Sequence, residues 1–389
     1  MLKNSTTELR LCQGSKSPSL RTRLPFKKGH QFAIIGRVAW RLEEINDAPR
    51  WDEFVLARAE YSITHSFAWG ELKGAFGWRP RRFILSEEGL PRAGAQILSR
   101  PIPVMGGELW YAPRGFLADY GDADLLRELT AALRDRAQEP GAVVLKIEPM
   151  APLDADLSVL QALAYVRRNR GVQPRHTLYL DLSRDEDDLL AGMDRRTRYN
   201  VNLAGRKGVF VRVGNKLEDL HVFYGLLEAT IERKHFLVHN LAYYEKVFQL
   251  FGPASAVLIA EHGGEPLAAA FVLGFGKYAY YAHAASSAAR RELKAANKVV
   301  WEAIRWAKGA GFQIFDFWGI PRDPSPRNPL HGVYTFKKGF GGETVEFAPP
   351  YDLPFKPVKY RLLNAGLALQ AAWRNVRARG TLRDPMGNE

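Results

Sequence analysis

Side chains able to act as nucleophiles or metal ligands are few in this chain and are not grouped. Its single cysteine, Cys12, lies in a basic N-terminal stretch, and its nine histidines show neither H-E-x-x-H nor zinc-ligand spacing. The sequence also lacks a G-x-x-x-x-G-K-[ST] phosphate loop and a G-x-S-x-G elbow. We therefore expect no metal site. The remaining chemistry is positioning and electrostatic stabilisation, applied to an acyl donor that arrives already activated.

Positive charge is the most informative feature of the composition. The chain has 55 Lys and Arg residues against 42 Asp and Glu, which gives a formal net charge of +13. Such an excess favours polyanionic partners: nucleic acid, anionic lipid or a diphosphate-bearing substrate. A basic surface that serves only solubility is the alternative.

The size and composition are typical of a soluble globular protein with two domains. The chain has 389 residues, of which 46% are hydrophobic and 25% charged. No apolar stretch is long enough to span a membrane, and the N-terminus lacks the apolar core of a secretory signal. A single cysteine fits a reducing compartment, so a cytoplasmic location is expected. Residues 1–36 are expected to form a disordered basic leader, and residues 381–389 a flexible tail.

The order of predicted elements in the first half of the chain is repeated in the second half. Gly-Gly turns at 106–107 and 263–264 separate short β-prone runs, and leucines at helical spacing between residues 125 and 133 indicate a helix. In the first half we predict strands at 82–86, 93–99, 109–112 and 142–147 and a helix at 123–137. In the second half we predict strands at 177–182, 256–260, 267–273, 278–281 and 313–318 and a helix at 295–308.

Meander strands followed by a helix and a returning strand form the core order of GNAT-type N-acetyltransferases. Two copies predict an α+β protein with two tandem GNAT-like domains, whose mostly antiparallel sheets are flanked by helices; two unrelated α+β segments are the alternative. The first domain is placed at 37–174 and completed by 346–380, and the second at 175–345. An acetyl-CoA site needs a glycine-rich turn before the central helix, and Arg290-Arg291-Glu292-Leu293-Lys294 has no glycine. Acetyl-CoA is thus disfavoured and no cofactor is expected.

Several segments together resemble the FemABX peptidyltransferases, which transfer amino acids from aminoacyl-tRNA to the stem peptide of a peptidoglycan precursor. Each segment is weak alone, but they follow the family's order from about residue 60 to 353. The family is a tandem pair of GNAT-like domains, in agreement with the repeat. The matching segments are Ser66-Phe67-Ala68-Trp69, Lys73, Gly77-Trp78, Trp110-Tyr111-Ala112-Pro113-Arg114-Gly115, Lys146-Ile147-Glu148-Pro149, Thr197-Arg198-Tyr199-Asn200, Leu203-Ala204, Tyr243-Tyr244, Asp316-Phe317-Trp318-Gly319-Ile320 and Phe336-Lys337-Lys338-Gly339-Phe340-Gly341-Gly342.

The resemblance implies two catalytic residues, Lys337 and Glu148. Lys337 matches the lysine of the family's F-K-x-x-F segment, where an ammonium would stabilise charge on the attacked carbonyl oxygen. Alternatively, Lys337 contacts the tRNA phosphates or is a solvent-exposed lysine in a turn. Phe336 would form a wall of the substrate site or belong to the core. Glu148 stands where the family usually carries aspartate, and it would orient the attacking amine or take its proton. Its extra methylene shifts the carboxylate.

The resemblance also implies a site for the precursor, which is either lipid-linked or UDP-linked. Lys73 matches a lysine that grips the diphosphate of a nucleotide-linked precursor, and Tyr243 matches a tyrosine of the substrate pocket. His239 departs from the pattern, because it replaces an arginine that can bind a diphosphate through two hydrogen bonds. Other basic residues would then hold the acceptor.

Three further expectations concern tRNA, the membrane and the coiled-coil arm of some family members. Arg195, Arg196, Arg198 and Arg206 form a basic helix face for tRNA phosphates, or a solvated face. The apolar stripe from Phe355 to Arg379 is expected to pack on the first domain, with an anionic membrane surface as the second hypothesis. The arm is expected to be absent, because no long insertion follows Leu226.

The sequence therefore predicts a monomeric aminoacyltransferase that uses aminoacyl-tRNA to build the peptidoglycan interpeptide bridge. A CoA-dependent acyltransferase acting on a cell-envelope sugar is a second hypothesis, and a basic RNA-binding protein without enzymatic activity is a third.

Overall fold

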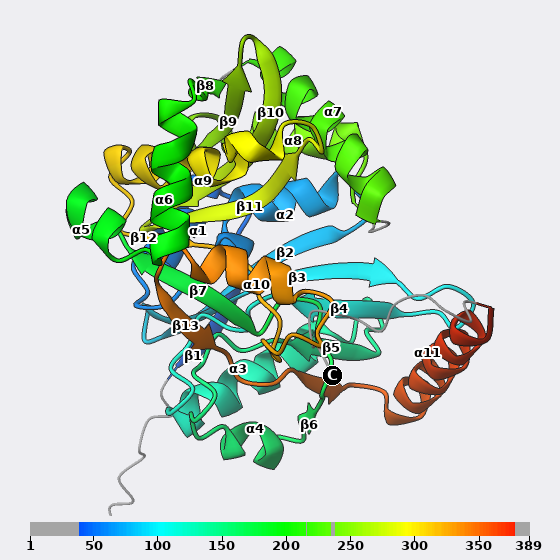
Figure 1. Ribbon diagram of the computed structural model, residues 1–389. Coiled ribbons are helices and arrows are strands. Elements are labelled where there is room, and N and C mark those ends of the chain that lie inside the picture. The colour runs from blue at the N-terminus through cyan, green and yellow to red at the C-terminus, as the bar shows by residue number, and fades with distance from the viewer. Residues whose placement is uncertain (1–38, 215, 235–237, 378–389) are drawn as a thin grey trace, which may run out of the picture. The chain divides into compact units, whose positions relative to one another are not determined.

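The computed structural model describes residues 39–214, 216–234 and 238–377, which form two seven-stranded sheets flanked by helices (Figure 1). The sheets are mostly antiparallel, which confirms the predicted α+β class. The predicted leader at 1–36 and tail at 381–389 lie outside the described residues.

The first sheet has the strand order β1-β2-β3-β4-β5-β14-β6. Among its neighbours β4 and β5 are parallel, because helix α3 (Ala123–Arg136) crosses between them. Asp122 caps α3 through the backbone amide of Leu125, and the buried leucines of α3 pack on the sheet with α4 (Ser158–Ala162). The strands are β1 (Trp40–Glu44), β2 (Arg79–Glu87), β3 (Leu90–Pro101), β4 (Glu108–Ala112), β5 (Val144–Ile147), β6 (Val166–Arg167) and β14 (Tyr351–Pro354).

The second sheet has the strand order β13-β7-β12-β11-β10-β9-β8. Here β11 and β12 are parallel, joined through helix α9 (Ala295–Gly309). Helices α5 (Glu186–Ala191), α6 (Arg195–Arg206) and α9 share one apolar core with this sheet, and α7 (Leu217–Lys234) and α8 (Leu241–Phe251) share another (Figure 1). The strands are β7 (His176–Asp181), β8 (Phe210–Gly214), β9 (Ser255–His262), β10 (Glu265–Phe275), β11 (Tyr278–Ser286), β12 (Ile314–Asp316) and β13 (Glu343–Glu346).

The two sheets are joined by a shared hydrophobic core. Helices α1 (Ala48–Leu56) and α2 (Phe67–Gly74), from the first half of the chain, pack in one cluster with α7, α8 and β10. The amide of Ile63, in the 3-10 helix η1 (Ile63–His65), donates to the Tyr280 hydroxyl at 3.1 Å, and the amide of Lys277 donates to the Tyr61 hydroxyl at 2.8 Å. Residues from Ala39 onward accordingly cluster as one compact unit. The predicted boundary near residue 174 falls between β6 and β7, and the division into domains stays a prediction.

Two connections matter for the site. The strand predicted at 313–318 ends at Asp316, because its carboxylate accepts a hydrogen bond from the Trp318 amide at 2.7 Å and bends the chain. Trp318 has a φ of 60°, which turns the backbone away from the sheet. Residues 235–240 lie between α7 and α8, and the absence of a coiled-coil arm stays a prediction.

The C-terminal segment returns to the first sheet through β14, which pairs with β5 and β6. Asp352, 1% exposed, accepts two hydrogen bonds of 3.0 Å from Lys146 and one of 2.9 Å from the Tyr360 hydroxyl. Tyr360 lies in α11 (Pro357–Arg377) and packs with Ile102 and Val143. The buried carboxylate thus ties β5, β14 and α11 together.

Replacing Asp352 with alanine should lower the free energy of unfolding by about 2–3 kcal/mol, because it leaves a hydroxyl and an ammonium without their acceptor. Urea unfolding followed by circular dichroism measures the change. Asp154→Ala is the matched control, since Asp154 is exposed. Equal midpoints for the two variants would contradict the structural role of Asp352.

Candidate active site

Lys337 lies in the last turn of helix α10 (His331–Lys338) rather than in a turn between glycines. Its ammonium donates a hydrogen bond of 2.7 Å to the carbonyl oxygen of Gly319, in the loop that follows β12. Burial lowers the pKa of Lys337 to about 8, and the nearby carboxylate of Asp316 opposes this shift. The ammonium is therefore held in place and loses its proton more readily than an exposed lysine.

Asp316 is the buried acidic group beside Lys337. It is 4% exposed and accepts hydrogen bonds from the Thr177 hydroxyl and the Trp318 amide. Burial raises the pKa of Asp316, while these hydrogen bonds and the charges of Arg114 and Lys337 lower it. Asp316 therefore fixes the loop whose carbonyl holds Lys337. The matching segment in the sequence contained Asp316, but the pattern gave no role for it.

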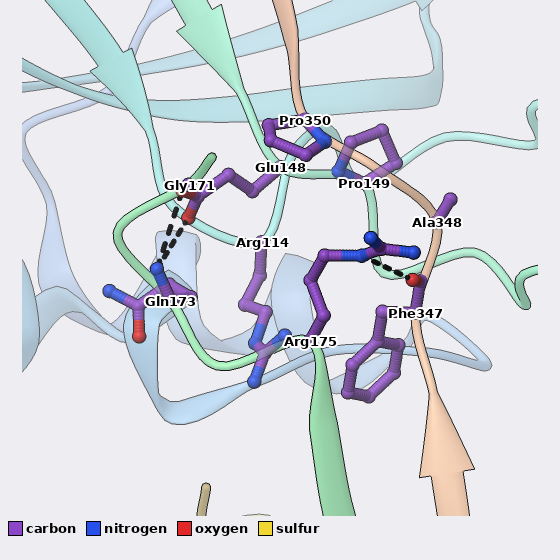
Figure 2. A pocket seen from close by; sticks show the side chains of 9 residues that line it. All are labelled: Arg114, Glu148, Pro149, Gly171, Gln173, Arg175, Phe347, Ala348 and Pro350. Atoms are coloured by element: carbon purple, nitrogen blue, oxygen red, sulfur yellow. Dashed lines mark hydrogen bonds between the residues drawn. The ribbon is translucent and has the colours of Figure 1, made fainter. Parts of the chain in front are cut away.

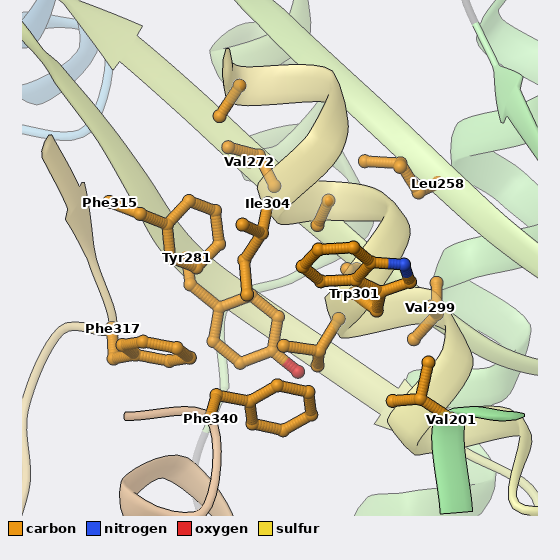
Figure 3. Close-up of a cluster of buried hydrophobic side chains, with 14 of the residues drawn as sticks. Val201, Leu258, Val272, Tyr281, Val299, Trp301, Ile304, Phe315, Phe317 and Phe340 are labelled. Atoms are coloured by element: carbon orange, nitrogen blue, oxygen red, sulfur yellow. The ribbon is translucent and has the colours of Figure 1, made fainter. Parts of the chain in front are cut away.

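The position of α10 depends on contacts beyond its C-terminal end. The Asp194 amide donates to the Gly339 carbonyl at 2.9 Å, and a side chain at 339 would overlap the Thr197 hydroxyl and the Asp194 carboxylate. Asp194 also caps α6, so α10 ends against the start of α6. Phe340, fully buried, packs against Phe317 with ring centres 6.0 Å apart (Figure 3). The C-terminal end of α10, directly after Lys337, is thus anchored on α6 and on the core of the second sheet.

A cavity of about 610 Å³ lies between α6, α10 and the N-terminal end of α9. Its volume is in the range of small-ligand sites. Four basic residues line it, Arg196, Arg290, Arg291 and Lys294, and Phe336 contributes an aromatic wall. The turn before α9 is held without glycine by positive φ angles at Arg290 (51°) and Lys294 (58°). Basic groups beside a helix N-terminus favour an anionic ligand.

The four arginines predicted to bind tRNA do not share one environment. Arg196 lines the cavity, whereas Arg198 donates at 2.9 Å to the carbonyl of Ala191 and so holds the end of α5. Arg195 is exposed, and Arg206 lies 5.9 Å from the ring centre of Tyr199. Among these four, Arg196 is the one that the structure brings to the cavity, and Arg290, Arg291 and Lys294 join it. In the sequence these three belong to a turn without glycine, whose basic residues could face a polyanion other than acetyl-CoA.

A second group of predicted residues comes together where α2 meets α8. The Lys73 ammonium donates to the Tyr243 hydroxyl at 2.8 Å and lies 4.6 Å above the Trp69 ring centre. His239 stacks on Tyr243 with ring centres 3.6 Å apart. Burial lowers the pKa of Lys73 to about 8, and burial together with the Lys73 charge lowers that of His239. We call Lys73, Tyr243 and His239 the lysine–tyrosine–histidine cluster.

Aromatic contacts connect this cluster to the loop beside Lys337. Trp69, next to Lys73, lies 6.4 Å from Trp318 between ring centres, and Trp318 lies 5.5 Å from Tyr280. The indole N–H of Trp69 is buried and has no hydrogen-bond partner among the described residues. Because Trp318 directly follows the Asp316 turn, one aromatic row runs from the cluster toward the Lys337 loop.

Glu148 lies in a different environment, which Figure 2 shows. Its carboxylate accepts hydrogen bonds from the Tyr111 hydroxyl at 2.6 Å and from the amides of Val172 and Gln173. Figure 2 draws the contact with Gln173. Burial raises its pKa, and these hydrogen bonds oppose the rise. The adjacent cavity, which Arg114 also lines, measures about 10 Å³, space for no more than a water molecule. The prediction that Glu148 acts on the amine remains untested, and its contacts support a role in holding the segment before β7.

Replacing Glu148 with glutamine should lower the free energy of unfolding by about 1–3 kcal/mol, because an amide nitrogen would then face backbone donors. Chemical denaturation measures this change, and Tyr111→Phe, which removes a single hydrogen bond to Glu148, should have the smaller effect. Unchanged stability combined with lost turnover would identify Glu148 as a catalytic group instead.

The described residues contain neither a candidate metal site nor a membrane-spanning helix. Within 39–214, 216–234 and 238–377, His, Cys, Asp and Glu side chains do not form a group of three that could hold a metal ion. Among helices in the same ranges, each is too short or too polar to cross a bilayer.

Comparisons with known proteins agree on one family. The FemAB family model matches residues 47–161, 161–263 and 258–366. The lipid II:glycine glycyltransferase of Staphylococcus epidermidis is 23% identical over 385 residues, covering 80% of this chain and 92% of the relative. The enzyme of that name from Staphylococcus aureus is 24% identical over 390 residues, with the same coverage. The crystal structure of FemX superposes with a TM-score of 0.76 at 22% identity, covering 82% of this chain and 99% of FemX.

Proposed function

The chain belongs to the FemAB family, and we propose that it transfers an amino acid from aminoacyl-tRNA to the stem peptide of a peptidoglycan precursor. The curated relatives are glycyltransferases that act on lipid II, which supports aminoacyl transfer and a lipid-linked acceptor. The product would be the first part of an interpeptide bridge.

The basic cavity is the observation that carries the donor side of this proposal. Arg196, Arg290, Arg291 and Lys294 supply positive charge for the phosphates at the 3′ end of a tRNA, and contacts to phosphate need no particular sequence. Phe336 offers a ring on which a base can stack. Thr335 and Phe336 of α10 line the cavity, so a donor bound there would lie beside the helix that carries Lys337.

The lysine–tyrosine–histidine cluster is the acceptor side of the proposal. A buried ammonium, one hydroxyl and one imidazole are suitable groups for a diphosphate. His239 gives a weaker contact than the arginine of related enzymes, so Lys73 would supply most of the charge. The unpartnered N–H of Trp69 is a further donor within this group.

The proposed reaction needs neither a metal nor a bound cofactor. The acceptor amine attacks the ester carbonyl, a C–N bond forms, and the C–O bond to the tRNA ribose breaks. The amine loses one proton, and the leaving ribose oxygen gains one. Lys337 would stabilise the negative charge on the carbonyl oxygen between these steps, and Asp316 would keep the Lys337 loop in position.

A transfer assay tests the proposal directly. The full chain is incubated with charged tRNAs and, separately, with lipid-linked and UDP-linked precursors, and each product is weighed by mass spectrometry. A mass gain of one or more amino acids, dependent on charged tRNA, is the expected result. Transfer from acetyl-CoA in place of charged tRNA would support the acyltransferase hypothesis. Salt-sensitive RNA binding without transfer to either precursor would support the RNA-binding one.

A further inference from the structure

Helix α11 is only partly covered by the rest of the protein. Tyr360 and Leu363 pack against Ile102 and Val143 at the edge of the first sheet. Lys359 donates a hydrogen bond of 3.0 Å to the carbonyl of Met105, in the turn between β3 and β4. Beyond this contact α11 extends away from the helices that cover the sheets (Figure 1). The side chains along its outer face are therefore open.

The outer face of α11 is apolar. Val358, Leu362 and Leu369 follow one another at four and then seven positions, which places them on one face of a helix. They are 71%, 59% and 68% exposed. Val104, which precedes Met105 in the β3–β4 turn, is fully exposed. Lys359 joins this turn to α11, so the two segments are adjacent, and the exposed Val104, Val358, Leu362 and Leu369 are together called the α11 surface.

The charged residues of α11 favour an anionic partner. The helix contains Lys359, Arg361, Arg374 and Arg377 and no aspartate or glutamate. Arg361 is exposed beside the apolar face. An apolar face with basic residues and no acids suits the surface of an anionic bilayer, which attracts both groups. RNA would bind the basic residues but would leave four large aliphatic side chains in water.

We propose that the α11 surface docks on an anionic lipid bilayer, with Val358, Leu362, Leu369 and Val104 entering the headgroup layer. The inference is independent of the proposed function, because it rests on exposure and charge outside the candidate active site. It predicts peripheral binding through one face of α11 and one turn. Such binding is reversible and depends on both anionic lipid and salt.

Vesicle co-sedimentation of the full chain tests this inference. Vesicles of phosphatidylcholine alone are compared with vesicles that also contain phosphatidylglycerol, both without any peptidoglycan precursor. The chain should bind the anionic vesicles at least about tenfold more tightly, and added salt should weaken this binding. In the double variant Leu362→Glu, Leu369→Glu, binding to anionic vesicles should fall about tenfold or more, since two charges then enter the headgroup layer.

The matched control is Leu90→Glu, because Leu90 is 69% exposed and is the first residue of β3, outside the α11 surface. It should leave vesicle binding unchanged, and thermal melts should show that both variants fold. Absence of binding to anionic vesicles, or equal loss in the control, would overturn the proposal. The proposal would also be overturned if the wild type were a dimer and the double variant a monomer, because a second copy of the chain would then cover the α11 surface. If the double variant lost tRNA binding but kept vesicle binding, the α11 surface would be an RNA-binding surface instead.

Discussion

Replacing Lys337 with methionine should lower kcat about 100- to 1000-fold, the range found when one charge-stabilising donor is removed from an acyl-transfer site. Methionine keeps the length and flexibility of the side chain but lacks the ammonium. Affinity for the precursor should stay within about twofold, because the group acts on the transition state and not on the bound acceptor. Steady-state kinetics with saturating charged tRNA measures both parameters.

Lys338→Met is the matched control for this experiment. Lys338 stands next along α10, is exposed, and donates its hydrogen bond to the Gly342 carbonyl. It should retain the turnover of the wild type. Loss of the Lys337 hydrogen bond leaves the buried Gly319 carbonyl without that donor, so a melting curve must show that Lys337→Met remains folded at the assay temperature. Equal changes in kcat and in precursor affinity would mean that Lys337 binds substrate rather than stabilising charge.

The repeat of elements was predictable from local signals. Gly106-Gly107 and Gly263-Gly264 lie in turns between strands, where each glycine adopts a positive φ that other residues disfavour. Strands β10 and β11 have apolar and aromatic runs long enough to be found from their residue types alone. The end of β12 was not predictable in this way. It depends on a carboxylate that captures the Trp318 amide and on Thr177, which lies 139 positions earlier in the chain.

The candidate site also depends on contacts between residues far apart in the sequence, which local signals do not predict. Lys73 and Tyr243 are 170 positions apart, and neither composition nor spacing indicates that one donates to the other. Their pairing requires α2 of the first half to pack on α8 of the second, through a core that both halves share. The family resemblance supplied Lys73, Tyr243 and His239 as a set. Asp316 reaches the site through the bend after β12, and Arg290 and Lys294 through a turn with positive φ angles, and a sequence pattern encodes neither feature.

Replacing Lys73 with methionine should weaken precursor binding about 10- to 100-fold, the value of one charge-assisted hydrogen bond to phosphate, while kcat at saturation changes little. Isothermal titration calorimetry with the precursor measures the affinity. Lys246→Met is the matched control, because Lys246 lies on the same helix as Tyr243 and bonds to Gln249. Similar losses for both variants would mean that the effect comes from net charge rather than from Lys73.

The pH dependence of binding separates Lys73 from the other cations. Its pKa is lowered to about 8 by burial, so the free protein carries the charged ammonium below that pH and increasingly the neutral amine above it. A bound diphosphate stabilises the charged form and raises the pKa. Affinity should therefore be constant below about pH 7 and fall above pH 8, by at most about tenfold per unit. The affinity of Lys73→Met should show no such decline. If the wild type and the variant decline in parallel, the titrating group lies elsewhere, and the diphosphate is not held by Lys73.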